Sequence, residues 1–343
     1  MNSALARSAT VFAAVAAALV VPASVRGQGI DLTVNDIGLA IGNKPRVTGV
    51  RLNYRDRNLQ AVKGLNATIW MPYEPMSGTV DGFALGLPLT AAHRITGVAA
   101  GIFGVGAEDE IVGLGVGGLG LGAGGNLTGI MLGGLGIGTG GRIAGLAASA
   151  VGVGAGRSMR GLIIGGIGVG GGGDVEGIAL GGIGVGGGGN LRGLSVGGIG
   201  VGTGGSMRGI SIGGIGVGAG GDVTGLNIGG IGVGAGGKLK GISLSAVGVG
   251  APRIEGFVLS AAAGAVNAKA VVIAPLYFRI EEGTLVGGSI SSINYIKGAQ
   301  RGLTIGLFNY ARQLHGVQIG VINVVDGPRG RRVLPIVNAQ FDP

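Results

Sequence analysis

A 16-residue repeat opened by glycine is the feature that most constrains how this chain folds. It runs without a slip from Gly97 to Lys240, and GLIIGGIGVGGGGDVE, from Gly161 to Glu176, is a typical unit. Half of the residues in that unit are glycine, and each would cost a helix ~1 kcal/mol relative to alanine. A fixed period is typical of stacked repeats, in which each unit contacts its neighbours. The repeat therefore predicts an all-β chain of stacked coils.

Aliphatic residues recur at positions 2, 4, 7, 9 and 15 of the unit, counted from the opening glycine. Side chains alternate along a strand, so positions 2 and 4 share a face, as do positions 7 and 9. The step from 4 to 7 changes parity, and so does the step from 15 to the next 2. We expect glycine corners at both steps to turn all five aliphatics toward one interior. The predicted fold is a right- or left-handed β-solenoid built from 14–16-residue glycine-rich coils.

The period also divides the chain into segments. Residues 1–27 have the features of a secretory signal peptide, with Arg7, an apolar run from Thr10 to Val21 and small residues before Gln28. The prediction for the rest is an entry and capping segment at 28–48, irregular coils at 49–96, the regular solenoid at 97–255, irregular coils at 256–301, and 14-residue repeats with a C-terminal cap at 302–343. We expect Gly29–Asn43 and the C-terminal LPIVNAQF to cover the exposed strand edges.

Stacking brings equivalent positions of successive coils into columns. Arg160, Glu176 and Arg192 occupy one such position and predict a ladder of alternating charge. In the C-terminal units the eighth position is asparagine, which predicts a structural ladder of hydrogen-bonded amides along the coils. The three residues of this ladder are Asn294, Asn309 and Asn323. A ligand site lined by the same three amides is the functional alternative.

The C-terminal units also carry a resemblance to a known family. The segment GLTIGLFNYARQLHGVQIGVINVV, the GAQRGLTIG that leads into it and LPIVNAQF near the end resemble the Leptospira-type bacterial surface-repeat family. The entry segment VTGVRLNYRDRNLQAVKGLNATIWMP is similar to that family too. The resemblance covers residues 30–341, and the central units depart from it by holding glycine where asparagine is expected. It implies export to the surface or envelope and transfers no catalytic residue.

No catalytic, cofactor-binding or metal-binding residue is predicted. The GxGxxG-like strings recur in nearly every unit, whereas a dinucleotide site has one such loop between a strand and a helix. The chain has no cysteine for thiolate metal ligands, and its two histidines, His93 and His315, are far apart in the sequence and are expected in connecting turns. The acidic run Glu108–Glu110 has no convergent partner in the sequence, and Asp174 and Asp222 lack the GGxGxD context of calcium repeats. An enzyme built on a solenoid scaffold therefore has little support.

The formal charge is +9, and the basic residues are spread along the chain apart from a group near each end. A nucleic-acid-binding protein usually shows a basic patch with interleaved aromatics, so nucleic acid is not an expected partner. The expected partners are an envelope or surface component, or a second copy of the chain.

These observations predict a non-enzymatic exported repeat protein of the cell surface or outer membrane, with the periplasm and the extracellular medium as other destinations. Its expected role is that of a structural or interaction scaffold. The main alternative is an integral outer-membrane β-barrel, supported by the leader, the absence of cysteine and the alternating Val337, Ala339 and Phe341. Barrel strands need ~9–11 alternating residues and aromatic girdles, whereas alternation breaks inside each central unit. Silk-like aggregating material is a further alternative.

Overall fold

The structure is a computed structural model that describes residues 29–327 and 330–341. The chain divides into two compact units, whose described parts are residues 29–135 and 136–341. Within the described residues every regular element is a β-strand, and no helix there is long and apolar enough to cross a membrane. The predicted signal peptide at 1–27 lies outside the described residues.

In the first unit the main strands belong to successive coils. β3 pairs with β4, β4 with β5, β5 with β6, β6 with β7 and β7 with β9, in each case in parallel. The short strand β8 also pairs with β7 in parallel. The nine strands are β1 (Gly29–Val34), β2 (Ile37–Gly42), β3 (Arg46–Arg55), β4 (Ala61–Trp70), β5 (Thr79–Gly86), β6 (Leu89–Gly101), β7 (Gly104–Gly117), β8 (Gly120–Ala123) and β9 (Leu127–Gly133).

In the second unit a long and a short strand alternate along the chain as far as β22. The strands there are β10 (Gly136–Thr139), β11 (Ile143–Ser149), β12 (Gly152–Ala155), β13 (Met159–Gly165), β14 (Gly168–Gly171), β15 (Val175–Gly181), β16 (Gly184–Gly187), β17 (Leu191–Gly197), β18 (Gly200–Thr203), β19 (Met207–Gly213), β20 (Gly216–Ala219), β21 (Val223–Gly229) and β22 (Gly232–Ala235). Longer strands follow, namely β23 (Lys238–Ser245), β24 (Gly248–Leu259), β25 (Ala262–Ile273), β26 (Tyr277–Ile280), β27 (Thr284–Ile290), β28 (Ile293–Gly327) and β29 (Gly330–Gln340).

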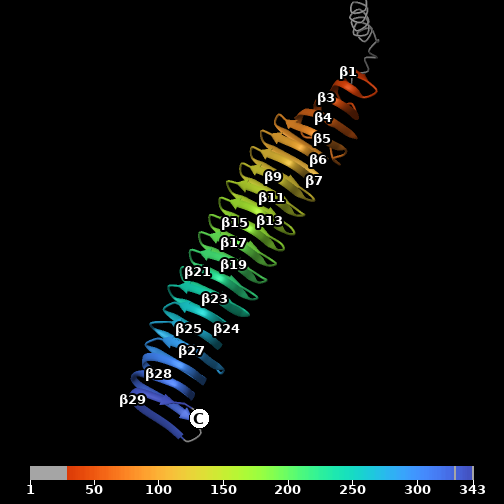
Figure 1. Cartoon of the computed structure of the whole chain (residues 1–343). Coiled ribbons are helices and arrows are strands. Elements are labelled where there is room, and N and C mark those ends of the chain that lie inside the picture. The colour runs from red at the N-terminus through yellow and green to blue at the C-terminus, as the bar shows by residue number, and fades with distance from the viewer. Residues whose placement is uncertain (1–28, 328–329, 342–343) are drawn as a thin grey trace, which may run out of the picture. The chain divides into compact units, whose positions relative to one another are not determined.

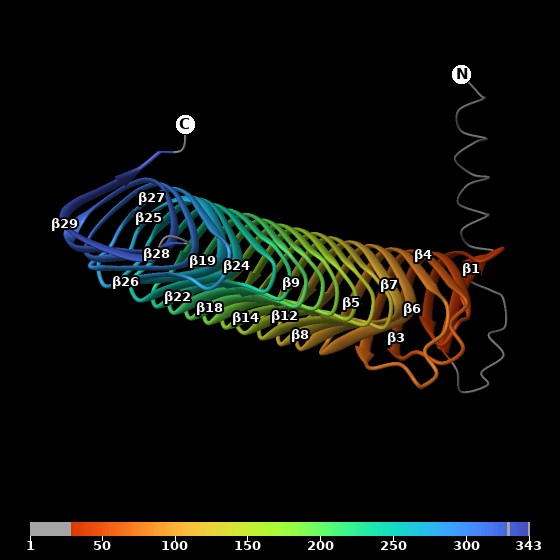
Figure 2. The ribbon, with the colours of Figure 1, turned by 90° about the horizontal axis from the view of Figure 1, so that it is seen from below.

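The pairing in the second unit shows that one repeat is one coil. Long strands pair in parallel with the next long strand, so that Met159 lies opposite Val175, and short strands pair with the next short strand. The long strands lie side by side in Figure 1, and Figure 2 shows the short strands β12, β14 and β18 side by side along another part of the same coils. Both units are therefore β-solenoids, as predicted. The alternative of a membrane β-barrel, which requires antiparallel neighbours, is not the fold.

Fewer of the aliphatic positions face the interior than the sequence predicted. Positions 15, 3 and 9 are buried, as Met159, Ile163 and Val169 show. Positions 2 and 4 are only half-buried in most coils, and position 7 is exposed, with 48% of Ile167 accessible. The expectation that all five aliphatics of a coil point inward is therefore wrong: positions 9 and 15 do, and positions 2, 4 and 7 do not.

The error lies in the expected change of parity at the opening glycine. β13 continues through Gly161, so positions 15 and 3 share the inner face of one strand while 16, 2 and 4 point outward. The bend expected after position 4 does occur, because β13 ends at Gly165 and β14 begins at Gly168. Ile167 lies in that bend and points away from the core.

An antiparallel strand lies at each end of the described chain. In the first unit β1 pairs with β2 through a two-residue turn, at which Asn35 and Asp36 have φ of 50° and 63°, as a type I′ hairpin requires. In the second unit β29 folds back antiparallel on β28. Of the segments predicted to cap the ends, Gly29–Asn43 contains both strands of the first hairpin, and LPIVNAQF forms most of β29 in the second.

Candidate binding surfaces

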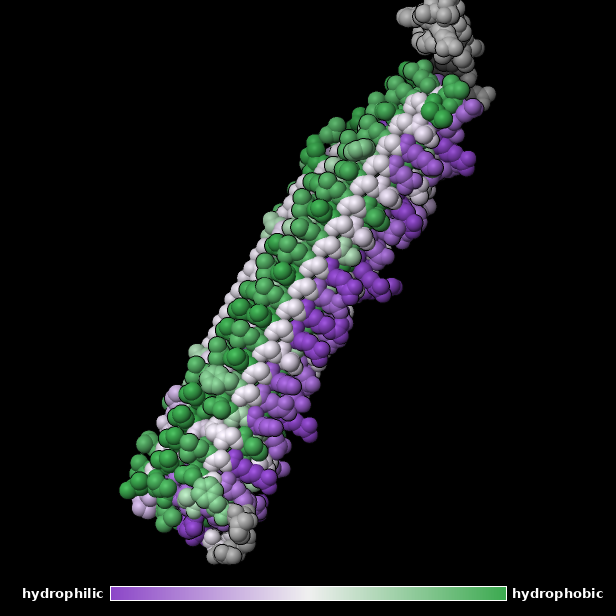
Figure 3. Space-filling model, viewed as in Figure 1, coloured by the Kyte–Doolittle hydropathy of each residue, from purple (hydrophilic) through white to green (hydrophobic). Residues whose placement is uncertain are grey.

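The second unit exposes an aliphatic surface that we call the apolar face. It comprises positions 2, 4 and 7 of the seven units that open at Gly145 to Gly241, and every one of these positions holds Leu, Ile, Val or Ala. Position 7 is the most exposed row, with 50% of Ile183, Ile199 and Ile215 accessible. Figure 3 shows apolar residues gathered over the long strands, beside a line of residues of intermediate hydropathy and a hydrophilic flank.

The residues of the apolar face are uniform along each row. Position 2 holds Leu146, Leu162, Ile178, Leu194, Ile210, Leu226 and Ile242; position 4 holds Ala148, Ile164, Leu180, Val196, Ile212, Ile228 and Leu244; and position 7 holds Val151, Ile167, Ile183, Ile199, Ile215, Ile231 and Val247. The three rows together expose on the order of 1,000 Å² of surface, more than the few hundred Å² of the largest apolar patch on a usual monomer. A surface of this size and composition indicates a contact with another apolar surface.

The charged flank carries the ladder predicted from the repeat. Arg160 donates to Glu176 through Nε at 2.9 Å and Arg192 donates to the other carboxylate oxygen at 2.6 Å. Asp174 accepts hydrogen bonds from the backbone and side chain of Asn190, one coil on. The prediction of an alternating ladder of Arg160, Glu176 and Arg192 is confirmed.

This ladder predicts an acid-side pH dependence. Hydrogen bonds from Arg160 and then from Arg192 lower the pKa of the Glu176 carboxyl below its usual value. Because this pKa is lowered in the folded state, the Glu176 carboxylate stabilises the fold at pH values above its unfolded-state pKa. That stabilisation is lost as the pH falls through the folded-state pKa. We expect carboxyl NMR titration to show the pKa of Glu176 rising in Arg160→Gln and in Arg192→Gln. The matched control is Arg208→Gln, in register with Arg192 on the far side from Glu176; an equal rise there would contradict the ladder.

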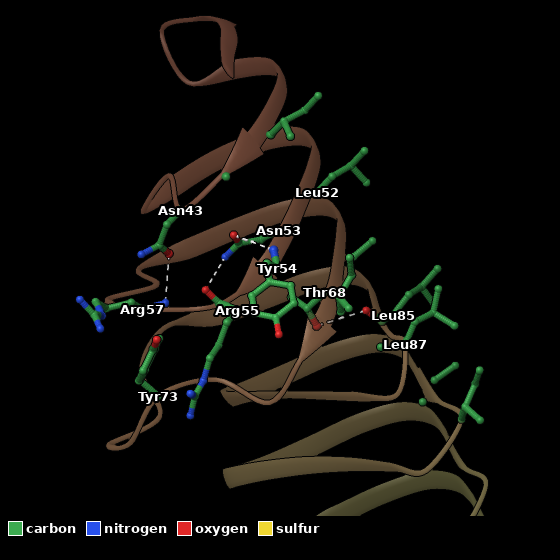
Figure 4. A pocket seen from close by; sticks show the side chains of 18 of the residues that line it. Asn43, Leu52, Asn53, Tyr54, Arg55, Arg57, Thr68, Tyr73, Leu85 and Leu87 are labelled. Carbon is green, nitrogen blue, oxygen red and sulfur yellow. Dashed lines mark hydrogen bonds between the residues drawn. The ribbon is translucent and has the colours of Figure 1, made fainter. Parts of the chain in front are cut away.

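The first unit contains a groove of about 1230 Å³ (Figure 4). Its apolar lining comes from successive coils and includes Leu52, Ile69, Leu85, Leu87 and Ile102. These side chains are exposed, and 61% of Leu87 and 59% of Ile102 are accessible. Asn43, Tyr54 and Thr68 add polar groups to the lining.

One side of the groove is basic, and Figure 4 shows Arg55, Arg57 and Tyr73 across the pocket from Leu52, Leu85 and Leu87. The Arg55 guanidinium lies 3.6 Å from the centre of the Tyr73 ring, and the Arg57 guanidinium lies 4.3 Å from the same ring. Arg55 also donates to the carbonyl of Met71 at 2.8 Å. Among the described residues no carboxylate forms an ion pair with either arginine. Tyr73 thus holds two cations together at the groove without neutralising them.

A buried polar network supports this end of the solenoid. The Arg51 side chain is fully buried and forms an ion pair with buried Asp56. Arg51 also donates to Asn66 Oδ1 at 2.8 Å and to Asn43 Oδ1 at 3.1 Å. Asp56 accepts further bonds from Asn53 at 2.7 Å and Asn66 at 3.0 Å. The network fixes the segment that carries Arg55 and Arg57.

The predicted asparagines lie together in one buried column of the second unit. Asn294 Nδ2 donates to Asn309 Oδ1, and Asn309 Nδ2 donates to Asn323 Oδ1, both at 2.8 Å. The column ends on β29, because Asn323 donates to the carbonyl of Leu334 at 3.2 Å. All three amides are fully buried and bonded within the chain, an arrangement that suits a structural ladder better than a ligand site.

A second amide column was missed by the sequence analysis. Gln318 Nε2 donates to Gln300 Oε1 at 3.1 Å, and Asn338 Nδ2 donates to Gln318 Oε1 at 3.3 Å. Gln300 occupies position 14 of its coil and Gln318 position 3 of a later one, so the period does not align them. Only the folded coils bring these amides into contact.

The structure does not bring the remaining singled-out residues into one site. His93 contacts Glu108 at 3.3 Å, and Arg94 pairs with Asp109 at 2.9 Å and Glu110 at 3.2 Å, on an exposed surface of the first unit. His315 belongs to the second unit. Within the described ranges no group of three or more His, Cys, Asp or Glu is placed to hold a metal ion.

Comparison of the chain with known protein families, curated proteins and solved structures found no match.

Proposed function

We propose that the protein is a non-enzymatic exported repeat scaffold of the cell surface or outer membrane that self-associates through its apolar face. The apolar face is the observation that carries the proposal, because its 21 positions hold no charged or polar residue. The predicted signal peptide and the resemblance to Leptospira-type surface repeats support the location.

A second copy of the chain is the partner that fits this face best. Stacked coils repeat at ~4.8 Å, and an identical chain offers rows with the same spacing over the same length. The estimated area is comparable to the ~800 Å² that each partner contributes to a standard interface. Interfaces between identical chains are also the most apolar class. In such a pair the isoleucines at position 7 would be buried between the copies.

The test adds charge to the apolar face. We expect the wild-type mature chain to form dimers or larger assemblies at micromolar concentration and Ile183→Lys/Ile215→Lys to be monomeric. Each half-exposed isoleucine contributes about 1 kcal/mol when buried. A two-fold interface uses each position twice, so the loss is about 4 kcal/mol, or roughly 1,000-fold in Kd. Sedimentation velocity over a range of concentrations measures the change.

The matched control is Ala144→Lys/Thr224→Lys, which adds the same charge at position 16, where Arg160 and Lys240 already lie in register. It should assemble like the wild type. A wild-type chain that stays monomeric at 100-fold higher concentration, on the order of 100 μM, would contradict self-association. Cell fractionation with protease added to intact cells tests the location, and a protein confined to the cytoplasm would contradict export.

A further inference from the structure

We infer that the groove of the first unit binds a long-chain fatty acid, with its carboxylate at Arg55 and Arg57 and its acyl chain along the apolar lining. The groove belongs to the first unit, whereas the apolar face belongs to the second. It combines an elongated apolar floor with two cations that have no carboxylate partner among the described residues. A ligand that matches both of these features has an anionic head group and a long apolar tail.

The basic side of the groove determines which head group the ligand has. Arginine presents a planar set of donors that matches a carboxylate. Tyr73 orders both guanidinium groups by stacking between them, at 3.6 Å and 4.3 Å. Asn43 fixes the backbone there, because its Oδ1 accepts the N–H of Arg57 at 3.0 Å. Binding a carboxylate on this side therefore needs little reorganisation of the protein.

The apolar lining of the groove determines the length of the ligand's tail. The lining runs through equivalent residues of successive coils, from Leu52 to Ala67, Leu85, Ala100 and Val116. Four steps between coils at ~4.8 Å give about 19 Å. An extended acyl chain of roughly 16 carbon atoms has this length at ~1.25 Å per bond. Leu87 and Ile102, exposed by 61% and 59%, would be covered by the chain.

The chain carries its own reporter for this site. Trp70 is the only tryptophan in the sequence. It lies on β4 opposite Arg55 on β3, next to the lining residue Ile69, and it is 45% exposed. A ligand whose head reaches Arg55 should therefore change the tryptophan fluorescence, with no signal from elsewhere in the protein.

The experiment titrates the full mature chain with myristate below its micelle concentration and follows Trp70 fluorescence. We expect saturable binding with one myristate per chain, and up to about fourfold weaker binding for each methylene removed. Uncharged tetradecanol should bind about tenfold more weakly than myristate. Arg55→Gln/Arg57→Gln should reduce myristate affinity to that of tetradecanol and leave tetradecanol binding unchanged.

A second variant tests the tail. Leu87→Ser/Ile102→Ser should weaken myristate and tetradecanol alike, whereas Leu276→Ser, equally exposed in the second unit, should change neither. Circular dichroism checks that each variant is folded. The inference is overturned if myristate and tetradecanol bind equally to the wild type, or if the double arginine variant binds myristate normally. It is overturned as well if fluorescence responds only to anionic phosphatidylglycerol vesicles, which would indicate a membrane surface instead.

Discussion

Gly209→Ala should destabilise the central coils of the second unit by about 3 kcal/mol or more, because the new methyl group has no space and the backbone is unsuited to it. Gly209 has φ of 124°, and a Cβ there would lie 2.1 Å from the carbonyl oxygen of Gly193 in the preceding coil. Backbone conformations of this kind cost alanine of order 1–3 kcal/mol, and overpacking against a fixed carbonyl adds typically 1–3 kcal/mol.

A matched substitution in the same coil separates this effect from a general intolerance of alanine. A Cβ on Gly218 meets nothing within 4 Å, and the φ of Gly218 is not in the left-handed region. Gly218→Ala should be neutral or stabilise the protein by ~0.4–1 kcal/mol, because alanine reduces the freedom of the unfolded chain.

Hydrogen exchange is the suitable measurement, since stacked repeats open locally and a single melting temperature is not well defined for them. Gly209→Ala should lose protection in β17, β19 and β21, while the C-terminal strands keep theirs. Equal protection in the two alanine variants would show that the opening glycines are dispensable.

Arg51→Met should destabilise the beginning of the first unit by roughly 3–5 kcal/mol, the usual cost of removing one partner of a buried ion pair. The Asp56 carboxylate would remain buried without its cation, and Asn43 and Asn66 would each lose a donor. Amide exchange in β2, β3 and β4 should accelerate, and the groove that depends on this segment should lose its order.

The double variant Arg51→Met/Asp56→Leu provides the control. It removes both charges, so it should recover a large part of the lost protection, as apolar replacements of buried ion pairs often do. If the double variant is as unstable as Arg51→Met, the ion pair is not the source of the stability. The Asn53 and Asn66 side chains, which also bond Asp56, would then be the elements to test.

The sequence predicted the solenoid because the sequence repeat and the structural coil have the same length. Met159, for example, lies opposite Val175, which is 16 residues further along the chain. For the same reason it placed the ladder of Arg160, Glu176 and Arg192 correctly. The predicted set of inward-facing residues was wrong because it depends on a corner at Gly161, where β13 in fact continues. A glycine with positive φ can remain inside a strand, and hydropathy alone does not distinguish an apolar interior from an apolar exterior.

The groove could not be predicted from the pattern. Trp70 and Tyr73 lie in a longer unit, from Gly64 to Asp81, that departs from the regular 16-residue period. The structure leaves both about two-fifths exposed or more and stacks Tyr73 with Arg55 and Arg57. Those contacts join a loop after β4 to the end of β3, and loop conformation has no periodic signal. The amide column through Gln300 and Gln318 was not predicted for a related reason. The number of residues per coil changes there, so the period does not align the two residues.

Each regular coil of the second unit pairs with the coil before it and the coil after it, with the same register each time. Deleting or duplicating one 16-residue unit therefore leaves every other junction intact and shortens or lengthens the apolar face by ~4.8 Å. In the proposed assembly the length of the contact between copies, and with it the strength of association, would therefore change in discrete steps of one coil.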